Sequence, residues 1–175
     1  FSLREVMITH FTESALYAHE VDIDIKDAQF SNNNALNGAA IYLNKSWRSN
    51  ITKSTFNNNM AVDDGGAIYL QNNVHHLSIK SSTFGGNEAG VFGGSLYSFE
   101  ENTYTTITKS YFYNNTAADS GGAVFLKEYN DYCTISECHF VNNTALVENG
   151  GALVVNEKSN YFHLSYGSFL ENKAA

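Results

Sequence analysis

Short apolar runs alternate with polar residues along the whole chain, and glycine-rich and asparagine-rich segments separate them. Within a run, Ile, Val, Tyr or Phe alternates with Thr, Ser or Asn over three or four positions, which is the period of a β-strand. No stretch shows the 3.6-residue apolar stripe of an amphipathic helix. The pattern therefore predicts an all-β chain built from short strands and turns.

The pattern recurs at a nearly fixed period, marked by the motif Phe-x-x-Asn. Successive motif phenylalanines lie 26, 28, 28, 28 and 29 residues apart. Self-similarity at a period of this size predicts a solenoid in which each repeat is one coil. The motif occupies residues 30–33, 56–59, 84–87, 112–115, 140–143 and 169–172, so its residues are Phe30, Phe56, Phe84, Phe112, Phe140 and Phe169 with Asn33, Asn59, Asn87, Asn115, Asn143 and Asn172.

A glycine element follows each of the first five motifs. Its members are Gly38, Gly65, Gly66, Gly93, Gly94, Gly121, Gly122, Gly150 and Gly151. Only the first copy departs, with Ala39 in its second place. Since glycine adopts a positive φ without strain, we expect the chain to turn here before the strands predicted at 40–43, 67–70, 95–98, 123–126 and 152–155.

Counting back from each motif phenylalanine aligns two further columns. The fifth residue before it is always aliphatic, and the second is always small; the aliphatic residues are Ile25, Ile51, Ile79, Ile107, Ile135 and Leu164. Such uniform columns predict that equivalent residues stack, as in a parallel β-helix of about six coils with roughly 28 residues each. The phenylalanines would form an aromatic ladder and the asparagines an amide ladder inside a single segment, residues 1–175.

The strand after the glycines alternates between two columns. Ile41, Ile68, Leu96, Val124 and Leu153 form a column that never admits a polar residue, so we expect it to face inward. The other column, Tyr42, Tyr69, Tyr97 and Phe125, would then be an external aromatic ladder. The opposite orientation, with rings inside and aliphatic residues outside, stays open at this point.

With Phe-x-x-Asn and Gly-Gly-Ala-[Ile/Leu/Val] paired in successive copies, the sequence resembles the repeat region of the chlamydial polymorphic outer membrane proteins, over residues 8 to 175. The resemblance implies a right-handed parallel β-helix and a secreted or surface-exposed adhesin. Similar repeats occur in large extracellular proteins of other microbes. Because both ends cut through a repeat, we expect the chain to be a window of a longer array.

Composition and charge exclude several classes. The net charge of -8, with no basic cluster, argues against a nucleic-acid partner. No apolar run is long enough to span a bilayer, so we expect no membrane insertion within this segment. Proline is absent, which suits continuous strand ladders in which every N–H is needed. Nothing in the sequence implies a cofactor.

Catalysis by a β-helix would need carboxylates that project together from adjacent coils. Asp22, Asp24 and Asp27 form the densest group, and the next coil adds no acid beside it. Asp63, Asp64, Asp119 and Glu148 precede glycines, where Asp favours turns. The six histidines, including the pair at 75 and 76, form no ligand set. We therefore expect neither a catalytic site nor a metal site.

Cysteine and glycosylation motifs leave two questions open. Cys133 and Cys138 occupy inward columns of one coil, either as two buried thiols or as a disulfide across a bend. Sequons occur at Asn44, Asn50, Asn114 and Asn142. Since Asn44 and Asn50 lie in a predicted loop, we expect glycans there first if the source is eukaryotic.

These features favour a non-catalytic extracellular protein, a stiff rod that forms or decorates a surface fibre or displays loops for adhesion. Its partners would be further copies of the same repeat, glycans or a cell-surface partner. The alternative is a carbohydrate-binding or carbohydrate-active β-helix that uses the tyrosine column as its sugar platform.

Overall fold

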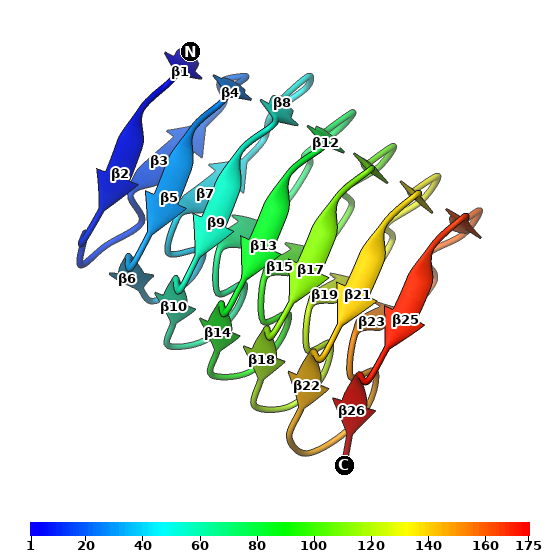
Figure 1. Ribbon diagram of the computed structural model, residues 1–175. Helices are drawn as coiled ribbons and strands as arrows, with labels where there is room; N and C mark the ends of the chain where they lie inside the picture. The colour runs from blue at the N-terminus through cyan, green and yellow to red at the C-terminus, as the bar shows by residue number, and fades with distance from the viewer.

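A computed structural model describes all residues, 1–175, as one right-handed spiral of strands (Figure 1). The chain climbs from its first strand to its last in about six coils of roughly 28 residues each. Each complete coil contributes one strand to each of four parallel sheets, which we name A, B, D and C in chain order. There is no helix, and consequently none that could cross a membrane.

The two seven-stranded sheets carry the first half of each coil. Sheet A consists of β1 (Ser2–Arg4), β4 (Asp24–Lys26), β8 (Asn50–Thr52), β12 (Ser78–Lys80), β16 (Thr106–Thr108), β20 (Thr134–Ser136) and β24 (His163–Ser165). Sheet B consists of β2 (Met7–Thr9), β5 (Gln29–Ser31), β9 (Thr55–Asn57), β13 (Thr83–Gly85), β17 (Tyr111–Tyr113), β21 (His139–Val141) and β25 (Ser168–Leu170).

The two six-stranded sheets carry the second half. Sheet D has strands of only two residues: β6 (Asn34–Ala35), β10 (Met60–Ala61), β14 (Glu88–Ala89), β18 (Thr116–Ala117), β22 (Thr144–Ala145) and β26 (Lys173–Ala174). Sheet C consists of β3 (Leu16–His19), β7 (Ile41–Asn44), β11 (Ile68–Leu70), β15 (Leu96–Phe99), β19 (Val124–Lys127) and β23 (Leu153–Asn156). Sheet D is an addition to the predicted elements, because two residues are too few to show a period.

Strand pairing follows the sequence columns. Ile79 is paired with Ile107 in sheet A, and Phe84 with Phe112 in sheet B. Every pairing between strands is parallel and joins equivalent residues of successive coils. The predicted all-β parallel β-helix, with its coil number and period, is confirmed.

The motif phenylalanines form a continuous stack inside the coil. Their ring centroids are 4.7–5.1 Å apart, and successive planes differ by 4–7°. Rings from Phe30 to Phe140 are buried. Burying a ring of this size removes a large apolar area from water, so the stack is a main source of stability in every coil.

The motif asparagines form an amide ladder at the corner between sheets B and D. Asn87 Oδ1 accepts hydrogen bonds from the backbone N and from Nδ2 of Asn59, both at 3.0 Å. Asn87 Nδ2 donates to the Phe56 carbonyl at 2.9 Å and to Asn115 Oδ1 at 3.0 Å. The pattern repeats as far as Asn172. An aspartate would lack these donors, which explains why only asparagine fills the column.

The two glycines of each pair serve different needs. Gly65 has a φ of +62°, which favours glycine at the turn. Gly66 does not have a positive φ; instead, a Cβ there would lie 2.2 Å from the Gly94 carbonyl oxygen of the next coil. The second glycine is therefore required by the close approach of adjacent coils rather than by the turn itself.

Candidate binding surfaces

The strand after the glycines places its aliphatic column inside, as expected. Ile41, Ile68, Leu96 and Val124 belong to the main core, and Leu153 packs against it. The aromatic column, which Tyr17 extends by one coil, faces outward and stacks with centroid separations of 5.0–5.6 Å. An outer aromatic ladder therefore runs along sheet C.

The middle of this outer ladder is covered, so the rings that the alternative function would use as a sugar platform are not open there. Tyr97 is only 2 % exposed, whereas Tyr17 at the end of the ladder is 61 % exposed. Phe92 and Phe99 flank Tyr97, with centroids 5.7 and 6.1 Å away, and create a second apolar cluster outside the coil. Burial raises the pKa of Tyr69 and of Tyr97 above that of a free phenol.

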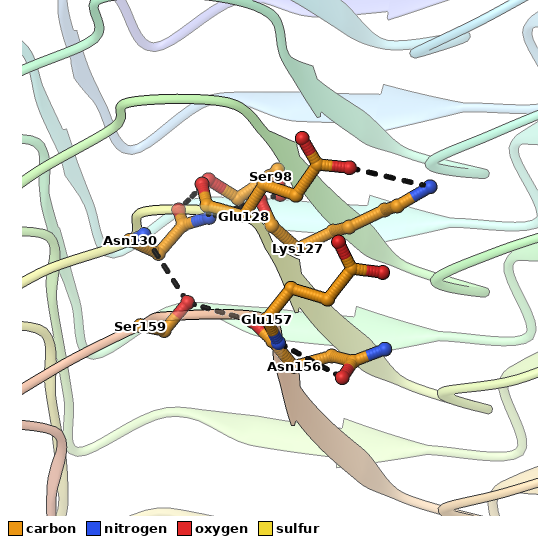
Figure 2. Close-up of polar contacts among 7 residues, drawn as sticks. All are labelled: Ser98, Lys127, Glu128, Asn130, Asn156, Glu157 and Ser159. Atoms are coloured by element: carbon orange, nitrogen blue, oxygen red, sulfur yellow. Dashed lines mark hydrogen bonds and ion pairs between the residues drawn. The ribbon is translucent and has the colours of Figure 1, made fainter.

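Lys127 covers one side of this cluster. Its Nζ lies 5.7 Å from the ring centroids of both Phe92 and Phe99, within the range of a cation–π contact. The same Nζ is 3.7 Å from Glu128 Oε1, and both side chains are largely buried (Figure 2). The ammonium group therefore shields the aromatic cluster from water while keeping a charged partner.

Asn130 anchors the loop that follows Lys127 (Figure 2). Its buried carboxamide accepts a hydrogen bond from the Ser98 hydroxyl and donates to the Lys127 carbonyl at 2.6 Å. Its backbone N donates to Ser159 Oγ of the next coil at 3.2 Å. Protein atoms provide the hydrogen-bond partners of all these groups. The network therefore holds the loop after Lys127 in place.

A small cavity of about 180 Å³ lies beside Lys127. Phe92, Phe125 and Val154 form its apolar part, and Lys127 and Glu157 contribute charge. Val154 is the partner of Phe125 in the next coil, so the outer ladder ends where a smaller side chain follows a ring. The cavity is thus a consequence of the break in the aromatic column.

The acidic residues before the glycines act mainly as hydrogen-bond acceptors for groups at the turns. Asp64 Oδ1 accepts a hydrogen bond from the Phe92 backbone N at 3.1 Å, and Asp119 Oδ1 accepts one from the Ser120 hydroxyl at 2.8 Å. Burial raises the pKa of Asp64 to about 6, partly opposed by the Phe92 hydrogen bond and the Lys127 charge. Asp64 is the carboxyl group whose titration is most altered by folding.

The carboxylates of Asp22, Asp24 and Asp27, the densest acidic group in the sequence, bind different partners and do not form one site. Asp22 Oδ1 accepts hydrogen bonds from the backbone N atoms of Trp47 and Arg48, at 2.7 and 2.8 Å, and these bonds lower its pKa. Asp24 forms an ion pair with Arg4, and Asp27 Oδ2 lies 3.9 Å from Lys26 Nζ. No group of three or more His, Cys, Asp or Glu side chains has the arrangement of a metal site.

A second outer ladder was missed from the sequence. His76, Tyr104, Tyr132 and Tyr161 stack with centroid separations of 4.7–4.9 Å and interplanar angles of 5–7°, and Trp47 lies 5.8 Å from His76. All are exposed. The histidine and the three tyrosines each stand eight places before a motif phenylalanine, so counting back further would have found them; Trp47 stands nine places before Phe56. Stacking covers their faces and leaves edges and hydroxyls toward solvent.

The largest hollow is a groove of about 710 Å³ at the corner between sheets A and B, which we call the corner groove. Its lining is Lys109, Ser110, Tyr111, Glu137, His139 and Tyr166. Lys109, Glu137 and Tyr166 stand three places before successive motif phenylalanines, so the corner itself aligns them. Lys109 Nζ is 3.6 Å from Glu137 Oε2, and His139 Nδ1 is 2.7 Å from Ser168 Oγ.

The sequon asparagines differ in accessibility. Asn50, Asn114 and Asn142 are exposed, and Asn142 Nδ2 donates to Asn114 Oδ1 at 2.7 Å. Asn44 is half-buried, and its Nδ2 donates to Gln71 Oε1 at 3.0 Å. Asn44 is the last residue of β7 and Asn50 the first of β8, so the two flank the loop in which the sequence placed them, and Asn50 offers the more accessible amide.

The two cysteines are buried free thiols, so the disulfide left open by the sequence is not formed. The strand β20 separates them, and Cys138 Sγ lies 3.3 Å from the Ser136 carbonyl oxygen. Burial raises the pKa of Cys133 to about 11, which keeps this thiol protonated at neutral pH.

Comparison with known proteins agrees with this architecture. Residues 1–166 match the family model described as "Right handed beta helix region". No curated protein and no solved structure shows significant similarity to the chain. Because the family model covers nearly the whole sequence, the chain belongs to the right-handed β-helix family.

Proposed function

We propose that this chain is a non-catalytic, extracellular structural and adhesive segment. It acts as a stiff rod that spaces or builds a surface fibre and offers its outer side chains to a partner. The observation that carries the proposal is the contrast between columns. The interior Phe and Asn columns repeat without change, whereas the exposed corners carry different side chains in successive coils.

Stiffness follows from the interior columns. Each complete coil is joined to the next complete coil by four strand pairings, a stacked ring and amide hydrogen bonds of the asparagine ladder. Bending the rod would separate stacked rings and stretch the amide ladder on one side, so bending is opposed at each coil.

The extracellular location rests on different support. The repeat resembles that of chlamydial polymorphic outer membrane proteins, in which it belongs to surface adhesins. Exposed sequons at Asn50, Asn114 and Asn142 would accept glycans in a eukaryotic secretory pathway, and we expect Asn50 to be used before the half-buried Asn44. Intact mass before and after glycosidase treatment tests this expectation, and an unchanged mass contradicts it.

Adhesion is testable with the purified chain. Beads coated with the folded chain should adhere to cell or glycan-coated surfaces, and beads coated with heat-unfolded chain should not. Equal adhesion by both would show that a non-specific coating effect is responsible. Absence of adhesion by the folded chain on all surfaces would contradict the adhesive role.

Carbohydrate binding is the second candidate function. The covered rings of sheet C do not favour it, but the corner groove does, because it combines exposed tyrosines with an ion pair and a histidine. Mixed aromatic and polar linings of this kind are typical of small-molecule sites.

A further inference from the structure

We propose that Tyr104 and Tyr132 form a site of oxidative cross-linking, at which a haem peroxidase joins the two phenol rings into a dityrosine. The bond would link two adjacent coils covalently on the outside of the rod. The inference goes beyond the proposed function and does not depend on adhesion, because it concerns only the chemistry of the second outer ladder.

The two tyrosines lie inside this ladder, with another ring on either side of the pair. His76 stacks on Tyr104 and Tyr161 stacks on Tyr132, both with centroids 4.7 Å apart. The strands β16 and β20 that follow the two tyrosines also have a neighbouring strand on each side in sheet A. Neighbours in both directions along the axis therefore hold the pair in place.

The backbone sets the two rings in register. Tyr104 and Tyr132 each stand two places before a strand of sheet A, and their φ angles are +58° and +57°. Their ring centroids are 4.9 Å apart and their planes differ by only 5°, so the two rings are displaced by about the spacing of adjacent strands. The carbons beside one hydroxyl therefore lie next to the matching carbons of the other ring.

The pair is accessible to an oxidant, and its rings have room to approach each other. Tyr104 and Tyr132 are both 45 % exposed. A covalent bond requires two ring carbons to come much closer than the stacking distance. Exposed side chains move about their torsions within nanoseconds, so a half-exposed ring can tilt toward its neighbour without disturbing the packed interior.

Other tyrosine pairs meet these conditions less well. The planes of Tyr69 and Tyr97 differ by 37°, and the two residues are only 8 % and 2 % exposed, so an oxidant does not reach them. The planes of Tyr111 and Tyr113 differ by 29°. Both of these residues belong to β17, so a bond between them would not join two coils.

The coupling balances with hydrogen peroxide as the oxidant that the peroxidase uses. The enzyme removes one electron and one proton from each phenol, and these reduce hydrogen peroxide to two waters. The two phenoxyl radicals then pair their electrons in a C–C bond between carbons ortho to the hydroxyls. Each of these carbons loses its hydrogen as a proton while the oxygen of the same ring gains one, which restores both phenols. In total, the chain loses two hydrogen atoms.

A bond at this site would fasten one coil to the next. Tyr104 and Tyr132 are 28 residues apart in the sequence, which is one coil. A cross-link that closes a loop of this length restricts the unfolded chain, as a disulfide does, and thereby favours the folded state. The cross-linked chain should consequently unfold at a higher denaturant concentration than the untreated chain.

The test exposes the folded chain carrying Tyr161→Phe to a haem peroxidase and hydrogen peroxide. This substitution keeps the stacked ring but removes the other phenol that stacks on Tyr132. The intact mass of the monomer should fall by two hydrogen atoms. After digestion with trypsin, peptides 81–109 and 128–158 should be recovered as one joined species, and fragmentation should place the bond between Tyr104 and Tyr132.

Tyr129→Phe in the same background is the matched control. Tyr129 lies in the same tryptic peptide as Tyr132, has a similar φ of +54° and is 42 % exposed, but its ring lies against Lys158 Nζ, 5.2 Å from the centroid, instead of another ring. The joined peptides should persist in Tyr129→Phe and be lost in Tyr104→Phe and in Tyr132→Phe. Unchanged thermal unfolding of each variant before treatment checks that it folds.

Four results would overturn the proposal. They are an unchanged mass after treatment, coupling only between separate molecules, joined peptides that persist in Tyr132→Phe, and joined peptides that are lost in Tyr129→Phe. An unfolding midpoint that is the same for the cross-linked and the untreated chain would overturn the role of the bond in fastening the coils.

Discussion

Two aromatic columns run along the same helix axis and differ in regularity. Inside the coil, successive phenylalanine planes differ by 4–7°. Along the outside of sheet C, the planes from Tyr17 to Phe125 differ by 10–37°. Burial differs in the same way: the inner rings are enclosed throughout most of the stack, but the outer column runs from exposed Tyr17 to enclosed Tyr97.

The difference shows what fixes each column. An inner ring meets the same neighbours in every coil, so the period alone determines its packing. An outer ring depends on neighbours that differ from coil to coil: Phe92 is paired with Ser120 of the next coil, and Lys127 at the end of β19 is paired with Phe99 and Asn156. We therefore expect stability to depend on the inner columns and recognition to depend on the outer residues.

The largest effect is expected from the inner ring stack. Phe84→Ala removes a fully buried ring with stacked neighbours 4.8 and 4.7 Å away and should lower the free energy of unfolding by about 3–5 kcal/mol. Chemical denaturation followed by circular dichroism measures the change. A loss below about 1 kcal/mol would mean that the stack is not a main support of the coil.

The next effect is expected from the amide ladder. Asn87→Ala leaves the Phe56 carbonyl and the Asn59 amide groups without their buried partner, and should cost about 2–4 kcal/mol. The control is Asn114→Ala: Asn114 belongs to an exposed amide pair, and although its φ of +55° favours asparagine over alanine, the substitution should cost no more than about 1 kcal/mol. Similar losses for the two variants would remove the distinction between inner and outer ladders.

Asp64 should make stability depend on pH. Folding raises its pKa from 3.8 to about 6, so the folded state holds the proton more tightly than the unfolded state does. The stabilisation is present in full below pH 3.8 and is lost as pH rises through about 6. After allowance for solvent screening, this loss amounts to about 1–2 kcal/mol.

The comparison of Asp64→Asn with the unaltered chain isolates this effect from other titrating groups. Chemical denaturation should show that the unaltered chain is less stable at pH 7 than at pH 4, and that Asp64→Asn lacks this difference. An identical pH dependence in both proteins would show that Asp64 titrates normally in the folded state.

A smaller effect is expected at the exposed end of the outer column. Tyr17→Ala removes a ring that is mostly in water and stacks only on Tyr42, 5.0 Å away, so it should cost about 0.5–1 kcal/mol. The same substitution at the covered Tyr97 should cost several times more. Equal losses at the two positions would show that the cover provided by Phe92 and Phe99 does not contribute.

The smallest effect is expected at Cys138. Earlier coils place Ser54, Ser82 and Ser110 in its column, and each of them accepts a backbone N–H there, so Cys138→Ser should change stability by less than about 0.5 kcal/mol. Adding a reductant should leave the unfolding midpoint unchanged, because both thiols are free. A midpoint that falls on reduction would indicate a disulfide.

The sequence predicted the residues that repeat and could not predict those that vary. Phe84, Asn87 and Gly66 were identifiable because each coil presents the same requirement at the same position. The ladder through Tyr104 and Tyr132 could also have been predicted, since both residues stand eight places before a motif phenylalanine.

The candidate site was harder to predict for a physical reason. The groove forms where Lys109, Glu137 and Tyr166 follow one another along the axis, and their column shows no shared chemistry. Likewise, Phe99 lies two residues after Tyr97 on the same face of β15, but Phe92 precedes that strand, and only the path of the chain before β15 brings its ring against Tyr97. Contacts between unlike columns depend on geometry that a period does not contain.

The central claim is that inner columns provide stability and outer residues provide recognition. The most direct test measures both the free energy of unfolding and the adhesion of coated beads for Phe84→Ala and for Tyr104→Ala, which removes an exposed ring from the middle of the second outer ladder. We predict that Phe84→Ala loses about 3–5 kcal/mol of stability yet adheres as the unaltered chain does while it is folded, and that Tyr104→Ala loses no more than about 1 kcal/mol of stability and adheres less. A Tyr104→Ala variant that loses as much stability as Phe84→Ala, with its adhesion intact, would contradict the claim.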